Sequence, residues 1–164
     1  MKHLKVWLLI GGLFASLSVG AQNEKFKALF IYNFTNYIEW PGQGSVFVIS
    51  VVGDSPIIDE LNTIAKIKKV GTATIQVKKI NSPTEASDAQ VVFIPAGKKK
   101  VVMDFAPVLK NSNTLIITDD ASGGFGINFV EVDQKQSFQI SKANIESHKL
   151  KVNSSLIALG IPVN

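Results

Sequence analysis

Arginine and cysteine are both missing from this chain of 164 residues. All 17 basic residues are lysines, so the chain lacks the planar guanidinium groups that usually read phosphate, carboxylate or guanine. Without cysteine, the chain can form neither a disulfide nor the acylated cysteine of a lipoprotein. Disulfides and lipoprotein anchoring are thereby excluded, and recognition of nucleotides or DNA is disfavoured.

Histidine is almost as scarce, because His148 is the only one beyond the first few residues. A hydrolytic triad needs a base beside its nucleophile, and a zinc site needs several nitrogen or sulfur ligands. One histidine supplies neither arrangement. His148 stands in the polar stretch Glu146 to Lys149, where we expect a solvated surface side chain. The sequence therefore predicts a protein that is not an enzyme, with no catalytic residue, no metal site and no cofactor.

The N-terminal segment carries Lys2 and Lys5, then an apolar run from Val6, then the small residues Val19-Gly20-Ala21. This pattern predicts a secretory signal peptide over residues 1–21, cleaved after Ala21. A membrane anchor is the alternative, but the run is interrupted by glycines and serines and is shorter than the roughly 20 apolar residues of a span. We expect residues 22–164 to form one exported domain, with little net charge and no direct membrane insertion.

Runs of apolar residues alternate with helical patterns along most of this domain. Continuous β-branched runs predict buried strands at 47–52, 91–94 and 114–118, and lysines alternate along an edge strand at 75–80. Helical spacing predicts helices over 57–65, after Pro56, and over 98–109. Alternation at 127–132 and 137–140 predicts an antiparallel hairpin. The fold class is therefore α/β: a three-layer sandwich with a mostly parallel central sheet and a C-terminal antiparallel hairpin.

An aromatic segment precedes the first strand and holds both tyrosines of the chain, Tyr32 and Tyr37, together with Trp40. Its apolar residues recur at helical spacing from Phe26, which predicts a helix with one buried face that Pro41 stops. Asn33 falls on that apolar face. A buried amide needs hydrogen-bond partners, so Asn33 is either a packing residue or part of a site.

This segment, Lys27 to Pro41, resembles the opening helix of the YfiR family, whose members begin with a lysine, continue with Tyr-Asn-Phe and close with Trp-Pro. Later blocks resemble the family in the same order: Val52 to Pro56, Gly123 to Phe129, Ser137 to Ile140 and Leu150 to Leu156. Family members often carry cysteines, and their absence here removes any redox control that the resemblance would suggest.

The resemblance implies a periplasmic regulator that binds the periplasmic sensor domain of an inner-membrane signalling protein and represses it. In the family the target is a diguanylate cyclase, and a sensor kinase could use the same kind of partner; a homodimer is possible. The alternative from another class is a periplasmic receptor for a small molecule. For partner binding we expect partly exposed aromatic anchors, and the candidate residues are Tyr32, Asn33, Tyr37 and Trp40.

Parallel sheets place ligand sites beyond the carboxyl ends of their strands. Residues at these ends give a candidate ligand cleft: Asp54, Ser55, Asp119, Asp120, Ser122, Gly123 and Gly124. For the last five residues a tight turn is the favoured interpretation, because Asp, Ser and Gly are the residues that such a turn requires. The glycines precede a hairpin rather than a helix, so a dinucleotide site is not indicated. The run Lys98 to Lys100 is either simply solvated or meets an acidic partner or anionic headgroups.

Overall fold

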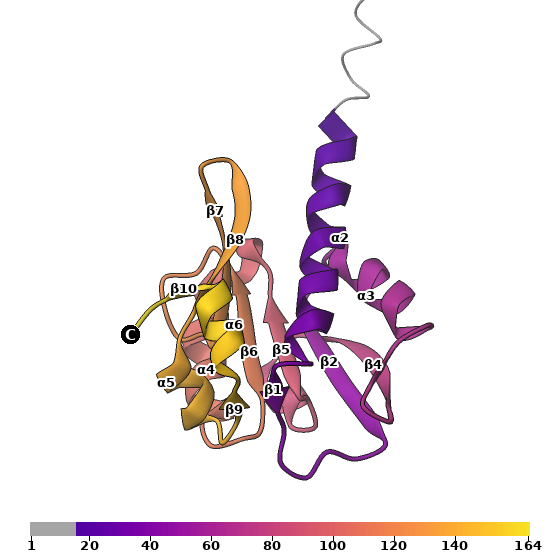
Figure 1. Ribbon diagram of the computed structural model, residues 1–164. Coiled ribbons are helices and arrows are strands. Elements are labelled where there is room, and N and C mark those ends of the chain that lie inside the picture. The colour runs from indigo at the N-terminus through magenta and orange to yellow at the C-terminus, as the bar shows by residue number, and fades with distance from the viewer. Residues whose placement is uncertain (1–15) are drawn as a thin grey trace, which may run out of the picture.

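The computed structural model describes residues 16–164, in which helices pack around one large sheet (Figure 1). The helices are α2 (Ser16–Phe34), α3 (Ile57–Ala65), α4 (Val102–Leu109), α5 (Lys142–Ser147) and α6 (Ser154–Leu159), with the 3-10 helices η1 (Pro83–Ala86) and η2 (Ala96–Val101). The strands are β1 (Ile38–Glu39), β2 (Val46–Val52), β3 (Lys69–Val70), β4 (Ala73–Ile80), β5 (Val91–Ile94), β6 (Leu115–Asp119), β7 (Ile127–Val132), β8 (Lys135–Ile140), β9 (Lys151–Val152) and β10 (Ile161–Pro162). Most of the expected leader lies outside the described residues.

Eight strands form the sheet, in the order β10-β8-β7-β6-β5-β2-β4-β3. The five central strands, β4, β2, β5, β6 and β7, run parallel to one another. Two further pairs are antiparallel: β3 with β4, and β8 with β7. The sheet is curled in Figure 1. The mixed α/β class and the mostly parallel sheet are thus confirmed. The last strand, β10, was not expected; it returns parallel to β8 and forms one edge.

The central strands bury both of their faces. In β2, Phe47, Ile49 and Val51 join the larger core cluster, which includes residues of α2 and α3, while Val48 and Val52 join a second cluster with residues of α4. Alternate side chains of a strand point to opposite faces, so the two clusters lie on the two sides of the sheet. Continuous apolar runs without alternation are the expected sequence of such strands.

The first helix ends earlier than its sequence predicts. α2 stops at Phe34, six residues before Trp40, and Ile38–Glu39 forms β1, which pairs antiparallel with β9. Thr35 donates its hydroxyl to the Tyr32 carbonyl (2.6 Å), and the Tyr37 carbonyl accepts from the Asn153 amide (2.8 Å). These bonds use backbone groups that a longer helix would need. The expectation that Pro41 ends the helix is therefore wrong.

Three other boundaries also differ from expectation. Residues 96–101 form the 3-10 helix η2, so the α-helix expected over 98–109 begins only at Val102. Asp133 and Gln134, both at positive φ (51° and 61°), form a two-residue turn between β7 and β8, so β8 already begins at Lys135. Ser154 or Ser155 is expected to cap a last helix that ends at Gly160, but the N-cap of α6 is Asn153, whose side chain accepts from the Ser155 amide (2.8 Å). Local turn chemistry decided each boundary.

Candidate functional site

An apolar groove of about 560 Å³ runs between the end of α2, the strand β8 and the helix α6. Aromatic contacts hold its floor together: the ring of Phe138 lies 5.0 Å from that of Phe34 and 6.3 Å from that of Phe30. Leu159, at the end of α6, is 66% exposed at the groove. The lining residues are Phe30, Asn33, Phe34, Asn36, Tyr37, Gln136, Ser137, Phe138, Leu156 and Leu159.

The polar groups of this groove are amides, one hydroxyl and one phenol. None of its lining residues is a lysine, histidine or carboxylate, so the lining lacks a general base beside a nucleophile. An apolar floor with scattered amides suits an apolar or aromatic side chain of a partner, or an uncharged small molecule. The lining therefore suits binding better than acid–base chemistry, since the Tyr37 phenol is its single titratable group.

The residues expected to bind a partner separate into three environments. Asn33 and Tyr37 line the groove, where both are partly exposed. Tyr32 is also partly exposed, but its hydroxyl donates to the Lys69 carbonyl (3.4 Å), away from the groove lining. The expectation that Asn33 is a fully buried amide is therefore wrong, because the groove opens one side of the α2 face that carries it.

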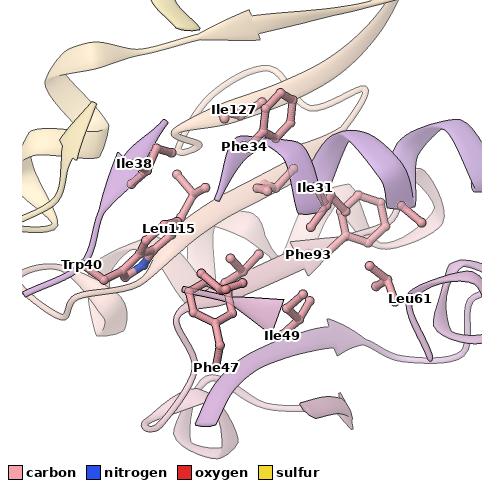
Figure 2. Packing of buried hydrophobic residues seen from close by; sticks show 14 of the residues in the cluster. Ile31, Phe34, Ile38, Trp40, Phe47, Ile49, Leu61, Phe93, Leu115 and Ile127 are labelled. Atoms are coloured by element: carbon pink, nitrogen blue, oxygen red, sulfur yellow. The ribbon is translucent and has the colours of Figure 1, made fainter. Parts of the chain in front are cut away.

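Trp40 occupies the third environment, the core. It is only 8% exposed, its ring stands edge-on to that of Phe47 at 5.0 Å, and its indole nitrogen donates to the Gln90 carbonyl (3.0 Å). Figure 2 shows Trp40 among the buried residues of the larger cluster. The expectation of a partly exposed Trp40 is wrong, because a strand, not a helix, carries the chain past this point and turns the indole inward.

A small cavity of about 280 Å³ lies at the carboxyl ends of β2, β5 and β6. It brings together Asp54, Ser55 and Asp119 from the expected ligand cleft, with Glu24 from α2 and Lys98 from η2. Lys79 donates to Asp54 (2.8 Å), and this hydrogen bond, with the charges of Lys79 and Lys98, lowers the pKa of the Asp54 carboxyl. This cavity is the crevice that parallel topology predicts.

Lys27 also lies at this edge of the sheet, and its role there was not predicted from the sequence. It is 7% exposed, and its ammonium donates to Asp119 (2.6 Å) and to Glu24 (3.4 Å). Burial acts to lower the pKa of Lys27, but the hydrogen bond and charge of Asp119, with those of Glu24, outweigh it and raise the pKa. One signal was available: Lys27 lies one turn before Ile31 on the buried face of α2.

The remaining cleft residues lie in a different cavity, of about 620 Å³. Asp120, Ser122, Gly123 and Gly124 line it together with residues of η2 and α4, and Lys99 donates to Asp120 (2.6 Å). Asp119 turns toward α2 and Asp120, at φ +57°, turns toward η2. The expected single cleft is therefore two cavities, because adjacent residues at the end of a strand point to opposite faces.

Asn128 fixes the loop that borders this second cavity. Its side chain is fully buried; Oδ1 accepts from the Thr118 hydroxyl (2.7 Å) and the Ala121 amide (2.9 Å). Its Nδ2 donates to the Ala121 carbonyl (3.1 Å) and to Gln139 (2.9 Å). The amide thus satisfies all its polar atoms and ties the loop to β6 and β8.

His148 is not the solvated side chain that its polar neighbours suggest. It is 8% exposed, its Nδ1 has no hydrogen-bond partner among the described residues, and burial lowers its pKa against the opposing effect of the backbone at Leu109 and Thr114. The polar stretch is misleading because the chain turns at Lys149, which takes a φ of +59°. Within residues 16–164, no three acidic or histidine side chains gather as metal ligands.

None of the helices within residues 16–164 combines the length and the apolar character that a membrane crossing requires. No curated protein matches this chain. A protein-family model described as YfiR/HmsC-like, however, matches residues 24–161. The match begins at Glu24 of α2, includes the residues of the groove and both cavities, and ends in β10. Since it spans most of the chain, the protein belongs to the YfiR/HmsC-like family.

Proposed function

We propose that this protein is an exported, non-enzymatic regulator that binds the periplasmic sensor domain of an inner-membrane signalling protein and holds it inactive. The family match over residues 24–161 carries the proposal. The target class is a diguanylate cyclase, which would place the protein in cyclic-di-GMP signalling; a sensor kinase is the second target class. The leader expected over residues 1–21 supports a periplasmic location.

The groove between α2, β8 and α6 is the docking surface that best fits this role. Protein interfaces concentrate their binding energy in a few apolar or aromatic anchors within an otherwise polar rim. Here Phe30, Tyr37 and Leu159 provide apolar surface, and Asn33 and Asn36 provide polar groups beside it. Asn33 and Tyr37 therefore remain candidate partner-binding residues, whereas the burial of Trp40 argues for a packing role.

Titration calorimetry with the periplasmic domain of a membrane sensor encoded next to this protein tests the proposal. We expect binding without turnover of ester, phosphate or glycosidic substrates. Leu159→Asp should weaken the complex by about 2 kcal/mol or more, because it places a charge in a desolvated contact. The matched control is Val108→Asp on α4, which also replaces an exposed side chain (58%) but lies outside the groove. Equal losses in both variants would refute the assignment of the groove.

A receptor for a small molecule is the second candidate function. The cavity at Asp54, Ser55 and Asp119 favours it, because charged groups of both signs converge there in about 280 Å³. Heat released with a zwitterionic solute such as an amino acid, reduced by Asp54→Asn, together with no binding to any sensor domain, would support the receptor and reject the regulator.

A further inference from the structure

Residues Lys66 to Lys69, which we call the basic turn, join the end of α3 to β3. Ile67, at 76%, is the most exposed large apolar side chain of the described residues. The lysines on either side, Lys66, Lys68 and Lys69, are exposed, and within residues 16–164 none of them forms an ion pair. One apolar side chain thus stands in water among three unneutralised positive charges.

Hydrogen bonds tie the backbone of the basic turn to α3 and α2. The amides of Ile67 and Lys68 donate to the Ile64 carbonyl (3.1 and 2.9 Å), which closes the end of α3. Tyr32 donates to the Lys69 carbonyl (3.4 Å), and the Lys68 ammonium lies 5.9 Å from the centre of the Tyr32 ring. The two-residue strand β3 then returns the chain to β4. The exposure of Ile67 is therefore built into the fold and is not a frayed end.

We propose that the basic turn docks the protein on an anionic phospholipid bilayer, with Ile67 entering the headgroup region and the three lysines contacting lipid phosphates. Each lysine near an anionic bilayer contributes about a fivefold increase in partitioning. Tyr32, half-buried behind the turn, carries a phenol of the kind that favours the membrane interface. One apolar side chain with three lysines gives reversible adsorption, not insertion of a segment.

Charge and composition favour lipid over an acidic protein surface. Protein interfaces are depleted in lysine and need a desolvated core of several anchors, whereas here a single isoleucine is surrounded by lysines. Lysine also suits headgroup phosphates as a flexible point charge. The other lysine cluster, Lys98 to Lys100, is less suitable because Lys99 already pairs with Asp120 (2.6 Å).

Flotation with phosphatidylglycerol vesicles tests the proposal. All variants are prepared as the exported protein with the same N-terminus, so that any effect of the leader on vesicle binding is the same in each. We expect binding at low salt that falls as salt rises, and no binding to phosphatidylcholine vesicles. Lys66→Gln/Lys68→Gln/Lys69→Gln should lower the partition coefficient at least about tenfold. Ile67→Gln should lower it about fivefold, through loss of the inserted apolar side chain.

The chain supplies matched controls. Lys98→Gln/Lys99→Gln/Lys100→Gln removes the same charge at the other cluster, and Met103→Gln replaces another side chain that is 71% exposed; both should bind vesicles much as the unchanged protein does. Absence of vesicle binding, or equal losses in the two lysine variants, would overturn the proposal. A basic-turn variant that binds vesicles normally but no longer binds a sensor domain would assign the turn to a protein partner instead. Vesicle binding needs no sensor domain, so its outcome is independent of the regulatory function.

Discussion

Lys27 and Asp119 are the clearest case of a residue pair that the fold, and not the local sequence, creates. They lie 92 positions apart, and their side chains are 9% and 16% exposed. Removing one partner from a buried ion pair leaves the other charge without compensation, and this costs more than the pair contributes. The pair therefore joins α2 to the end of β6 at the edge where the small cavity lies.

We expect Lys27→Met to lower the free energy of unfolding by about 3 kcal/mol, because Asp119 is then left poorly solvated. Adding Asp119→Leu should recover much of that loss. Urea denaturation of the two single variants and the double variant measures the coupling. Lys142→Gln is the control, since it breaks the exposed pair with Glu146 and should cost less than about 1 kcal/mol. A Lys27→Met loss no larger than this control would contradict the buried-pair assignment.

His148 predicts a pH dependence of stability. Burial holds its pKa below the ordinary value of about 6.5, so the folded protein keeps the imidazole neutral where the unfolded chain binds a proton. Above pH 6.5 both states are neutral and the residue adds no pH dependence. As pH falls below 6.5, the free energy of unfolding should decrease, by at most about 1.4 kcal/mol per pH unit.

Denaturation at pH 7.5 and pH 5.0 measures this effect, and His148→Gln serves as the comparison because glutamine does not titrate. The carboxylates contribute equally to both proteins, so the difference between the two pH dependences reports His148. A difference near zero would show that His148 is as accessible to protons in the folded protein as in the unfolded chain.

Single side chains were predicted from the sequence only where their neighbours in the chain decide their surroundings. Phe34 of α2 is buried as helical spacing from Phe26 predicts, but Leu29, at the same spacing, is 47% exposed and Ile31 is buried instead. The environments of Trp40 and His148 do not follow from local spacing, because contacts with Gln90 and with the segment around Leu109 and Thr114 come from distant parts of the chain. Polar neighbours along the sequence say little about burial when the chain turns sharply.

At the scale of elements, the loop between β6 and β7 depends on Asn128. Four hydrogen bonds from this one amide hold the loop backbone at Ala121 and the side chains of Thr118 and Gln139. The Asn128 amide is buried, and all of its polar atoms form hydrogen bonds. The sheet residue Asn128 therefore fixes the conformation of the loop, in addition to the loop's own turn residues.

Asn128→Leu should lower the free energy of unfolding by about 2–4 kcal/mol, because Thr118 and the Ala121 backbone are left without partners. Hydrogen exchange of the Ala121 amide should become faster by more than the lower global stability of the variant explains. The control is Asn153→Ala, which removes only the cap of α6 and should cost about 1 kcal/mol. Unchanged exchange at Ala121 would mean that the loop holds its shape without Asn128.

The interiors of most elements could be predicted, and their ends could not. β2, β5 and β6 and the helix α3 lie where apolar patterning predicts them. The two-residue strands β1, β9 and β10 carry too few residues for any pattern, and they form only because a distant partner is present. The groove could not be predicted for the same reason: α2, β8 and α6 meet there only in the folded chain.

For the whole molecule, α2 runs from Ser16 to Phe34 and so includes the expected cleavage point after Ala21. From Gln22 onward, the first side chains of α2 that are buried in the core are Lys27 and Ala28. We therefore expect the exported protein to begin at Gln22 and to keep its fold, because these described core residues of α2 all follow the cleavage point.

Mass spectrometry of the exported protein checks the new N-terminus, and its thermal midpoint checks the fold. A chain deleted from Gln22 to Leu29 is the matched comparison, because it also removes Lys27 and Ala28 from the core; it should melt at a much lower temperature. Retention of Met1 in the membrane fraction would contradict both the processing and the proposed location.

Both edges of the large sheet end in strands of two residues, β3 on one side and β10 on the other. β10 also contains Pro162, which has no amide hydrogen to donate. These strands cover little of their neighbours, because β3 pairs only with Ala73 and Thr74 of β4, and β10 pairs only with Gln139 and Ile140 of β8. The remaining outer backbone of β4 and β8 is not paired within the sheet. Side-chain charge therefore has to protect the longer of these edges: Lys78 and Lys79 lie on β4, where charged side chains disfavour pairing with an incoming strand.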